Sequence, residues 1–176
     1  MTQVIFGLGN PGKEYEGTRH NVGARVAGEF AAKTKIKKLT VMPATTFINK
    51  SGDAVGKWVK SKAAAKNLIV IHDDLDLPFG RFKISFARGA GGHRGVESVI
   101  KKLKTEEFIR LRIGIAPTTP SGKPKKPSGE DKIVKFILGK FTPKEEVVLK
   151  KMMPKLAEAL EAITTENLAV AMNRFN

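Results

Sequence analysis

The chain has 176 residues, 41% of them hydrophobic, which suits a single globular domain with a sizeable core. Thirty-two Lys and Arg against seventeen Asp and Glu give a net charge of +15, which favours a polyanionic partner such as nucleic acid over a merely solvated basic surface. The absence of cysteine excludes disulfides, thiolate nucleophiles and cysteine-bound metal centres, and no segment has the length and apolarity of a transmembrane helix.

The N-terminal half predicts two strands and one helix. Residues 4–6 form a short apolar run, and the segment 1–7 that contains it has the pattern of a strand, not of a signal peptide. We therefore expect a cytoplasmic protein. From Asn21 the apolar residues recur at helical spacing, and the continuous apolar run 68–71 predicts a central strand that is covered on both faces.

The middle of the chain predicts a strand, a helix and a further strand. Residues 82–86 alternate between apolar and polar side chains, which predicts a strand with one wetter face. Apolar residues at 96, 99, 100 and 103 predict a helix that turns Lys101, Lys102 and Lys104 outward. Residues 111–115 alternate again and predict another strand.

The C-terminal part predicts helices. Thr142 and Glu145 form a capping-box pattern, and the helix that they begin carries apolar residues as far as Ile163. Pro154 is expected to kink or split this helix, and a last helix is expected from Thr165. Residues 117–131 predict a mobile surface loop. Strands that alternate with helices predict a single α/β domain over residues 1–176, with a mixed, mostly parallel sheet flanked by helices.

Residues 7–12 match the dinucleotide-binding pattern G-x-G-x-x-G after a strand. That pattern requires a helix to begin at the third glycine, so that its N-terminus receives the pyrophosphate. Here the helical periodicity starts only after His20, which makes nucleotide binding the weaker interpretation.

The three histidines differ in their settings. His20 lies at a polar junction between a loop and a helix, which suits a general base. His93 lies in a glycine-rich loop that begins a helix, which suits contact with a ligand or a moving lid. His72 ends a buried strand and is interpreted as a core residue.

Three acids, Asp73, Asp74 and Asp76, follow the apolar strand, at the edge where open α/β sheets bind ligands. They could hold magnesium, cap the turn before Pro78, or orient His20 as the acid of a catalytic triad does. Since the sequence has neither a nucleophilic-serine motif nor a cysteine, water is the expected nucleophile.

Asn10 and Asn49 either stabilise turns or offer amide groups to a peptide backbone.

Several stretches, in the same order, resemble the bacterial peptidyl-tRNA hydrolase family, and together they span most of the chain: residues 7–12, 15, 18–23, 43–52, 72–78, 91–95, 108–114 and 136–141. The resemblance implies an enzyme that hydrolyses the ester bond between a peptide, or another N-blocked amino acid, and tRNA, and so recycles tRNA from stalled translation. It implies a monomer with one α/β domain that uses peptidyl-tRNA as substrate and needs no metal or other cofactor.

The resemblance also implies a role for each matching residue. His20 matches the base that activates water, and Asp73 matches the acid that orients His20. The other matching positions are Asn10 and Asn49, which hold the peptidyl group, Tyr15 and His93, which form walls of the cleft, and Arg112, which contacts tRNA phosphate.

Three departures from the family pattern are visible. Arg94 replaces an asparagine thought to place the water or polarise the carbonyl, and we expect its side chain at the rim of the cleft. Arg94 could itself place the water or polarise the carbonyl, or it could bind phosphate. It could also be only an exposed arginine at the start of a helix. Ser85 replaces a phosphate-binding lysine, which leaves Lys83 or Arg88 to substitute. The segment before Pro43 is short, so that a strand or hairpin beside the cleft is expected to be missing.

A non-catalytic RNA-binding protein on the same scaffold is the alternative function.

Overall fold

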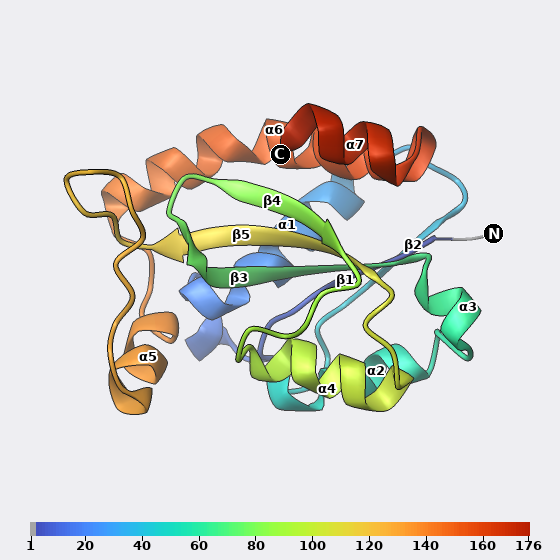
Figure 1. The fold of residues 1–176 in the computed structure, drawn as a ribbon, viewed down its shortest axis with the longest axis horizontal. Coiled ribbons are helices and arrows are strands. Elements are labelled where there is room, and N and C mark those ends of the chain that lie inside the picture. The colour runs from blue at the N-terminus through green and yellow to red at the C-terminus, as the bar shows by residue number, and fades with distance from the viewer. Residues whose placement is uncertain (1–2) are drawn as a thin grey trace.

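A central sheet of five strands organises the molecule, whose computed structural model describes residues 3–176 (Figure 1). The strand order is β2-β1-β3-β5-β4, in which β4 alone runs antiparallel to its neighbour. This confirms the predicted mixed, mostly parallel sheet; Met1 and Thr2 of the predicted first segment lie outside the described residues. The strands are β1 Gln3–Gly7, β2 Leu39–Met42, β3 Leu68–Pro78, β4 Phe82–Phe86 and β5 Ile109–Ala116.

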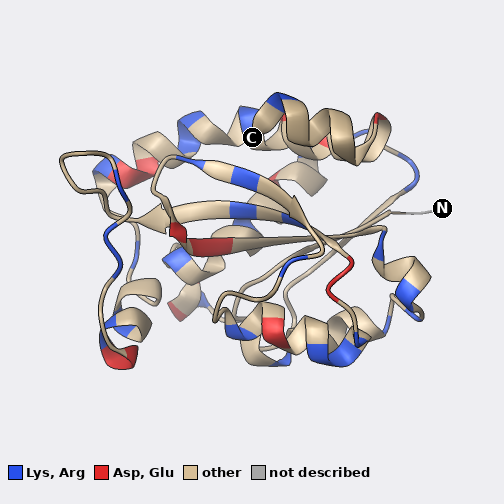
Figure 2. Ribbon diagram, in the orientation of Figure 1, with Lys and Arg blue, Asp and Glu red and all other residues tan. Residues whose placement is uncertain are grey.

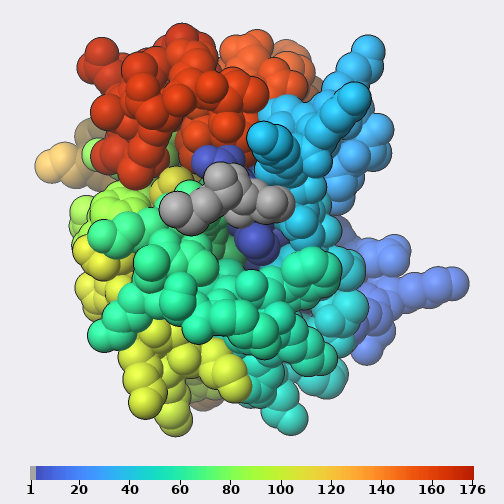
Figure 3. Space-filling view, turned by 90° about the vertical axis from the view of Figure 1, so that its right-hand side faces the viewer, coloured from blue at the N-terminus to red at the C-terminus, as the bar shows by residue number. Residues whose placement is uncertain are grey.

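Helices cover both faces of the sheet. One face packs against α1 Val22–Lys33, α6 Pro143–Thr165 and α7 Leu168–Phe175, and the other against α2 Ser51–Gly56, α3 Lys62–Ala65 and α4 Arg94–Leu103. Figure 3 shows these layers from the end of the molecule, with α6 and α7 at the top and α2 and α3 at the bottom. The eight-residue helix α5 Glu130–Ile137 lies at the end of the sheet that faces away from the viewer in Figure 3. In Figure 1 this is the left-hand end, to which the β5 arrow points.

The central strand β3 is buried on both faces, as its continuous apolar sequence predicts. Ile69 and Ile71 join the hydrophobic cluster beneath α1 and α6, whereas Leu68 and Val70 join the cluster beneath α2 and α4. Each cluster therefore receives alternate side chains of the same strand.

Two glycines let α1 pack directly on the sheet. A Cβ atom at Gly7 would lie 2.2 Å from the Gly23 carbonyl oxygen, and one at Gly23 would lie 2.2 Å from the Ile71 oxygen. Gly23 belongs to the first turn of α1, which follows the short helix η2 Arg19–Asn21. This close approach brings His20, in η2, beside Asp73 in the middle of β3. Gly12 is followed only by the three-residue helix η1 Lys13–Tyr15, so residues 7–12 begin no long helix that could bind a dinucleotide.

The predicted capping box is confirmed at the start of α6, where Thr142 and Glu145 bond each other's backbone N–H. Of the two outcomes expected at Pro154, a kink or a split, the split does not occur, because α6 continues through this residue from Pro143 to Thr165. Proline removes one backbone hydrogen bond, whereas apolar residues on both sides of it bury into the same cluster and hold the helix together. The final helix α7 begins after an Asn167 cap, slightly later than predicted.

Candidate active site

The candidate site lies beside residues 72–76 of β3 and the neighbouring strand β5. The sequence predicted a strand over the apolar run 68–71 that His72 ends, but β3 continues through the acidic run to Pro78. Its backbone pairs with β5 as far as Asp74 with Gly114, and again at Pro78 with Ala116 after an irregularity. Backbone pairing therefore keeps Asp73 and Asp74 extended, and the acidic run lies toward the carboxyl-terminal edge of the parallel strands.

His20 and Asp73, 53 residues apart in the sequence, meet at this edge. The Nδ1–H of His20 donates to Asp73, with Nδ1 at 2.9 Å from Oδ1 and 3.1 Å from Oδ2. Both residues are buried, at 8% and 3% exposure. Burial alone would raise the pKa of the Asp73 carboxyl, but His20 and His93 outweigh burial and hold that pKa far below its ordinary value. The carboxylate therefore carries its charge beside the His20 ring.

The other two histidines complete a cluster around Asp73. His93, the residue before α4, places Nε2 at 2.9 Å from Asp73 Oδ1. His72 directs Nδ1 to the Asp73 carbonyl oxygen at 2.6 Å, and its ring lies 4.8 Å from that of His93. Burial, followed by His93, lowers the pKa of His72 well below its ordinary value, so His72 is a neutral, buried residue. The sequence interpretation of His72 as a core residue agrees with this placement.

The three acids turn to three different groups of partners. Asp73 bonds the histidines, Asp74 accepts from the Asp76 backbone N–H and from Arg112 Nε, and Asp76 pairs with Lys126. The Arg112 and Asp74 atoms lie 2.6 Å apart and are nearly buried. The three carboxylates therefore do not converge on one ion, and Asp74 bonds the backbone of Asp76 within β3. Within residues 3–176, the atoms of His20, Asp73 and His93 that could ligate a metal ion lie within 4.8 Å of one another. These atoms form hydrogen bonds with each other.

A cavity of about 800 Å³ opens beside the histidine cluster. Asn10 and Asn49 line it, together with His20, Asp73 and His93. The Oδ1 atom of Asn10 accepts the Ile48 backbone N–H at 2.9 Å, which fixes the orientation of the amide. Its NH₂ group has no hydrogen-bond partner among residues 3–176 and can donate to a ligand.

Tyr15 lies one layer behind this cavity. Its ring meets Phe47 edge-on, with centroids 6.2 Å apart, and it is Phe47, half exposed, that lines the cavity. The sequence analysis did not identify Phe47 as a separate site residue, although it belongs to the matching stretch 43–52.

The arginines of β5 form the basic side of the cavity. Arg110 and Arg112 both line it, as does Arg88 from the loop after β4, and Figure 2 shows the positive residues of β4 and β5 beside the acidic end of β3. Burial, followed by the neighbouring Arg112, lowers the pKa of Arg110 to about 10, and its Nε atom has no partner within the described part of the chain. Lys83 is exposed on β4, opposite Arg112, and does not line the cavity.

Sequence reasoning missed Arg110. It pairs directly across from Ser85, so a guanidinium from β5 stands opposite the position at which the family resemblance implies a lysine. The alternation Ile109, Arg110, Leu111, Arg112 was the signal that could have revealed it, because residues two apart on a strand share a face.

Arg94 lies at the rim of the cavity, in the first turn of α4. Its side chain is 66% exposed and forms an ion pair with Glu130, the first residue of α5. The guanidinium thus joins α4 to α5, two elements that both line the cavity.

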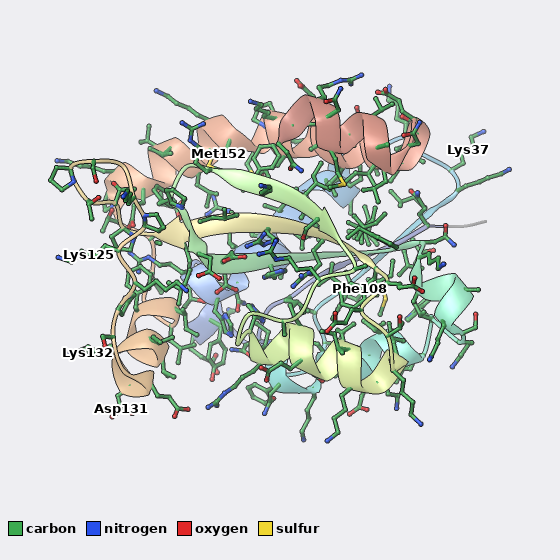
Figure 4. All side chains as sticks on the ribbon, viewed as in Figure 1. Lys37, Phe108, Lys125, Asp131, Lys132 and Met152 are labelled. Atoms are coloured by element: carbon green, nitrogen blue, oxygen red, sulfur yellow. The ribbon has the colours of Figure 1, made fainter. Side chains whose placement is uncertain are left out.

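Helix α5 and the loop before it form the far wall. The predicted loop ends slightly earlier than expected, because residues 130 and 131 already belong to α5. Apolar residues of α5 and the next two positions line the cavity: Ile133, Val134, Ile137 and Leu138. In Figure 4 Lys125, Asp131 and Lys132 lie along this wall, whereas Lys37 lies at the opposite end of the molecule.

Arg19 ties the loop that carries His20 to this wall. Its guanidinium lies 4.4 Å from the Phe136 ring centroid and 2.9 Å from a Glu145 carboxylate oxygen. The Arg19 backbone N–H also donates to the Gly139 oxygen at 3.0 Å. The residue before the histidine is therefore fixed by partners from α5 and α6.

The fold and the site together define a class: an α/β protein with a histidine–carboxylate pair and a guanidinium-rich cavity, the arrangement of a hydrolase for an anionic substrate. The family model for peptidyl-tRNA hydrolase matches residues 4–176. The chain belongs to the peptidyl-tRNA hydrolase family.

Individual relatives agree with this assignment. The peptidyl-tRNA hydrolase of Dehalococcoides mccartyi is 37% identical over 193 aligned positions that cover 99% of each chain. That of Thermoanaerobacter pseudethanolicus is 40% identical over 192 positions and 98% of each chain. The crystal structure of the Acinetobacter baumannii peptidyl-tRNA hydrolase is 26% identical and superimposes with a TM-score of 0.83, covering 100% of this chain and 96% of that chain.

The alignments exceed the 176 residues of this chain, so these relatives carry additional residues. In the described residues α1 is followed after only five residues by β2, and a groove beside them is lined by small residues of α1 and by Pro43. No helix in the described part of the chain is long and apolar enough to span a membrane.

Proposed function

We propose that this chain hydrolyses the ester bond between a peptide and tRNA, with water activated by His20. The observation that carries the proposal is the buried His20–Asp73 pair at the edge of a cavity with guanidinium groups on one side. Family membership supports the reaction, and the geometry supports the roles of the residues.

The roles follow from the protonation of the pair. Because Nδ1–H of His20 donates to Asp73, the neutral ring leaves Nε2 free to accept a proton from water. As the water oxygen attacks the ester carbonyl carbon, its proton passes to Nε2, and Asp73 stabilises the resulting imidazolium. The same proton then passes to the ribose oxygen as the bond from that oxygen to the carbonyl carbon breaks, which releases the peptide acid and tRNA.

The peptidyl group is held by Asn10 and Asn49. The NH₂ group of Asn10 can donate to a peptide carbonyl, and His93 and Phe47 form the wall of the cavity with Tyr15 behind Phe47. A free, charged α-amino group would be poorly solvated among these neutral groups, which selects for a blocked amino group.

The tRNA is held by Arg88, Arg112 and Lys83, with Arg110 as a further charge near Ser85. Such contacts to phosphate do not depend on sequence. We propose that the protein acts as a cytoplasmic monomer, without a metal or other cofactor.

Release of peptide from a mixed peptidyl-tRNA pool by the purified protein tests the function. We expect hydrolysis at catalytic concentrations of protein. Tight tRNA binding with no release would instead identify the protein as a non-catalytic RNA-binding member of the family.

The salt dependence of tRNA binding should report on Arg88. This residue lines the cavity and its side chain forms no ion pair within residues 3–176, so each phosphate that it neutralises releases a counterion. We expect Arg88→Ala to lower the slope of log K against log salt by about 0.9. Lys37→Ala removes the same charge at the opposite end of the molecule and should leave the slope unchanged (Figure 4). Equal slopes for the two variants would contradict this assignment.

Arg94 should act on binding more than on the chemical step. Its exposed side chain is held by Glu130 at the rim, so Arg94→Ala should raise KM about two- to fivefold and reduce salt sensitivity, with kcat nearly unchanged. Arg94→Lys, which keeps the charge, should preserve most of the affinity. A fall in kcat that Arg94→Asn restores would show that the arginine performs the asparagine's task instead.

A further inference from the structure

The two ring nitrogens of His93 have partners of opposite kind. Nδ1 accepts the backbone N–H groups of Gly95 and Val96, at 3.2 and 3.3 Å, and so caps the start of α4. A nitrogen that faces two N–H donors uses its lone pair and carries no proton. In the neutral ring the proton is therefore on Nε2, which donates to Asp73 Oδ1 at 2.9 Å.

Asp73 receives this donor on the same oxygen that accepts from His20. Nδ1 of His20 and Nε2 of His93 both lie 2.9 Å from Oδ1. The two histidines come from different elements, one from η2 beside α1 and the other from the loop before α4. The carboxylate, with 4% of its side chain exposed, is thus held from two sides.

We propose that His93 is a positioning residue for hydrolysis: the start of α4 fixes its tautomer, and its Nε2–H holds the Asp73 carboxylate in the orientation that directs His20. This inference rests on the proposed function and adds to it, because it gives a wall of the cleft a defined task. His93 acts through Asp73 and then His20, and its role does not require contact with the reacting atoms.

The surrounding charges favour this arrangement. The groups that face Asp73 or His93 are His20 from η2 and neutral His72 from β3. The charge of Arg110 from β5 acts on His72, while Asp74 and Arg112 are engaged with each other. The two N–H donors lower the pKa of the Asp73 carboxyl despite its burial, so the carboxylate accepts from both rings at neutral pH.

The tautomer can be measured without any turnover. The chain has three histidines. Nitrogen NMR spectra of the parent and of three variants, each with one histidine replaced, therefore assign every ring. We expect His93 to carry its proton on Nε2 and His20 to carry its proton on Nδ1. A proton on Nδ1 of His93 would overturn the proposal, whether or not the protein hydrolyses peptidyl-tRNA.

A pair of variants separates positioning from capping. Asparagine at 93 places an acceptor near the position of Nδ1 but is too short to reach Asp73. Glutamine places an amide N–H near the position of Nε2 but loses the capping acceptor. We expect His93→Asn to keep the melting temperature and to lose about 10²-fold in kcat. His93→Gln should lose about 2–4 °C in melting temperature and retain most of kcat.

A merely structural role for His93 predicts the reverse ranking. If kcat falls with melting temperature, so that the glutamine variant is the less active one, the proposal is wrong. If the parent itself releases no peptide, the proposed function fails, and the tautomer of His93 then tests the geometry separately.

Discussion

His20→Ala should lower the rate constant for peptidyl-tRNA hydrolysis about 10²- to 10⁴-fold, the range supplied by a positioned general base. The buried ring contacts Asp73 and lines the cavity, so its removal takes away the acceptor for the water proton and leaves the guanidinium side of the cavity intact. Single-turnover kinetics with saturating enzyme measure this rate constant apart from binding.

Binding of tRNA provides the control for this variant. Affinity should change less than twofold, since Arg88 and Arg112 lie in elements other than η2. Equal rates for parent and variant would exclude His20 as the base.

Asp73→Asn should lower the rate about 10²- to 10³-fold. The amide oxygen of asparagine can still accept the two histidine N–H groups, but it has no charge to stabilise the imidazolium that forms as water loses its proton. The loss is smaller than that for His20→Ala, because the base itself is retained. Since asparagine is nearly isosteric, circular dichroism should show an unchanged fold.

Chelation separates this mechanism from a metal-dependent one. With EDTA present the parent should keep its full activity, because the proposed reaction uses Asp73 to orient His20. Activity lost with EDTA and restored by magnesium would assign Asp73 to a metal site instead, and would remove the basis for His20 as the proton acceptor.

Much of the fold could be predicted because its signals are local. The apolar run 68–71, the helical spacing after Asn21 and the capping box of Thr142 and Glu145 each depend on neighbours in the sequence. The misplaced boundaries depend on distant partners. β3 extends beyond His72 because β5 pairs with it, and α6 passes through Pro154 because both halves of the helix bury into one core.

The candidate site divides in the same way. His20, Asp73 and Arg94 were identified from a family resemblance and from departures from it, and the structure places the first two within hydrogen-bond distance. The bond of His93 to Asp73 depends on the side on which α4 approaches the sheet, and the apolar wall from α5 depends on how the last third of the chain folds back. Ile133, Val134, Ile137 and Leu138 do recur at helical spacing, but that spacing does not show which part of the molecule they contact.

The partners of Arg19 have a consequence for the order of events during synthesis. His20 and Asp73 are made early, but the loop that carries His20 is fixed by Phe136 and Glu145, more than a hundred residues later. A nascent chain that has left the ribosome only as far as β5 therefore has both members of the histidine–aspartate pair but lacks the contacts that hold His20 in place. We expect such a chain to be inactive, so the protein acquires its activity only when its own translation is nearly complete.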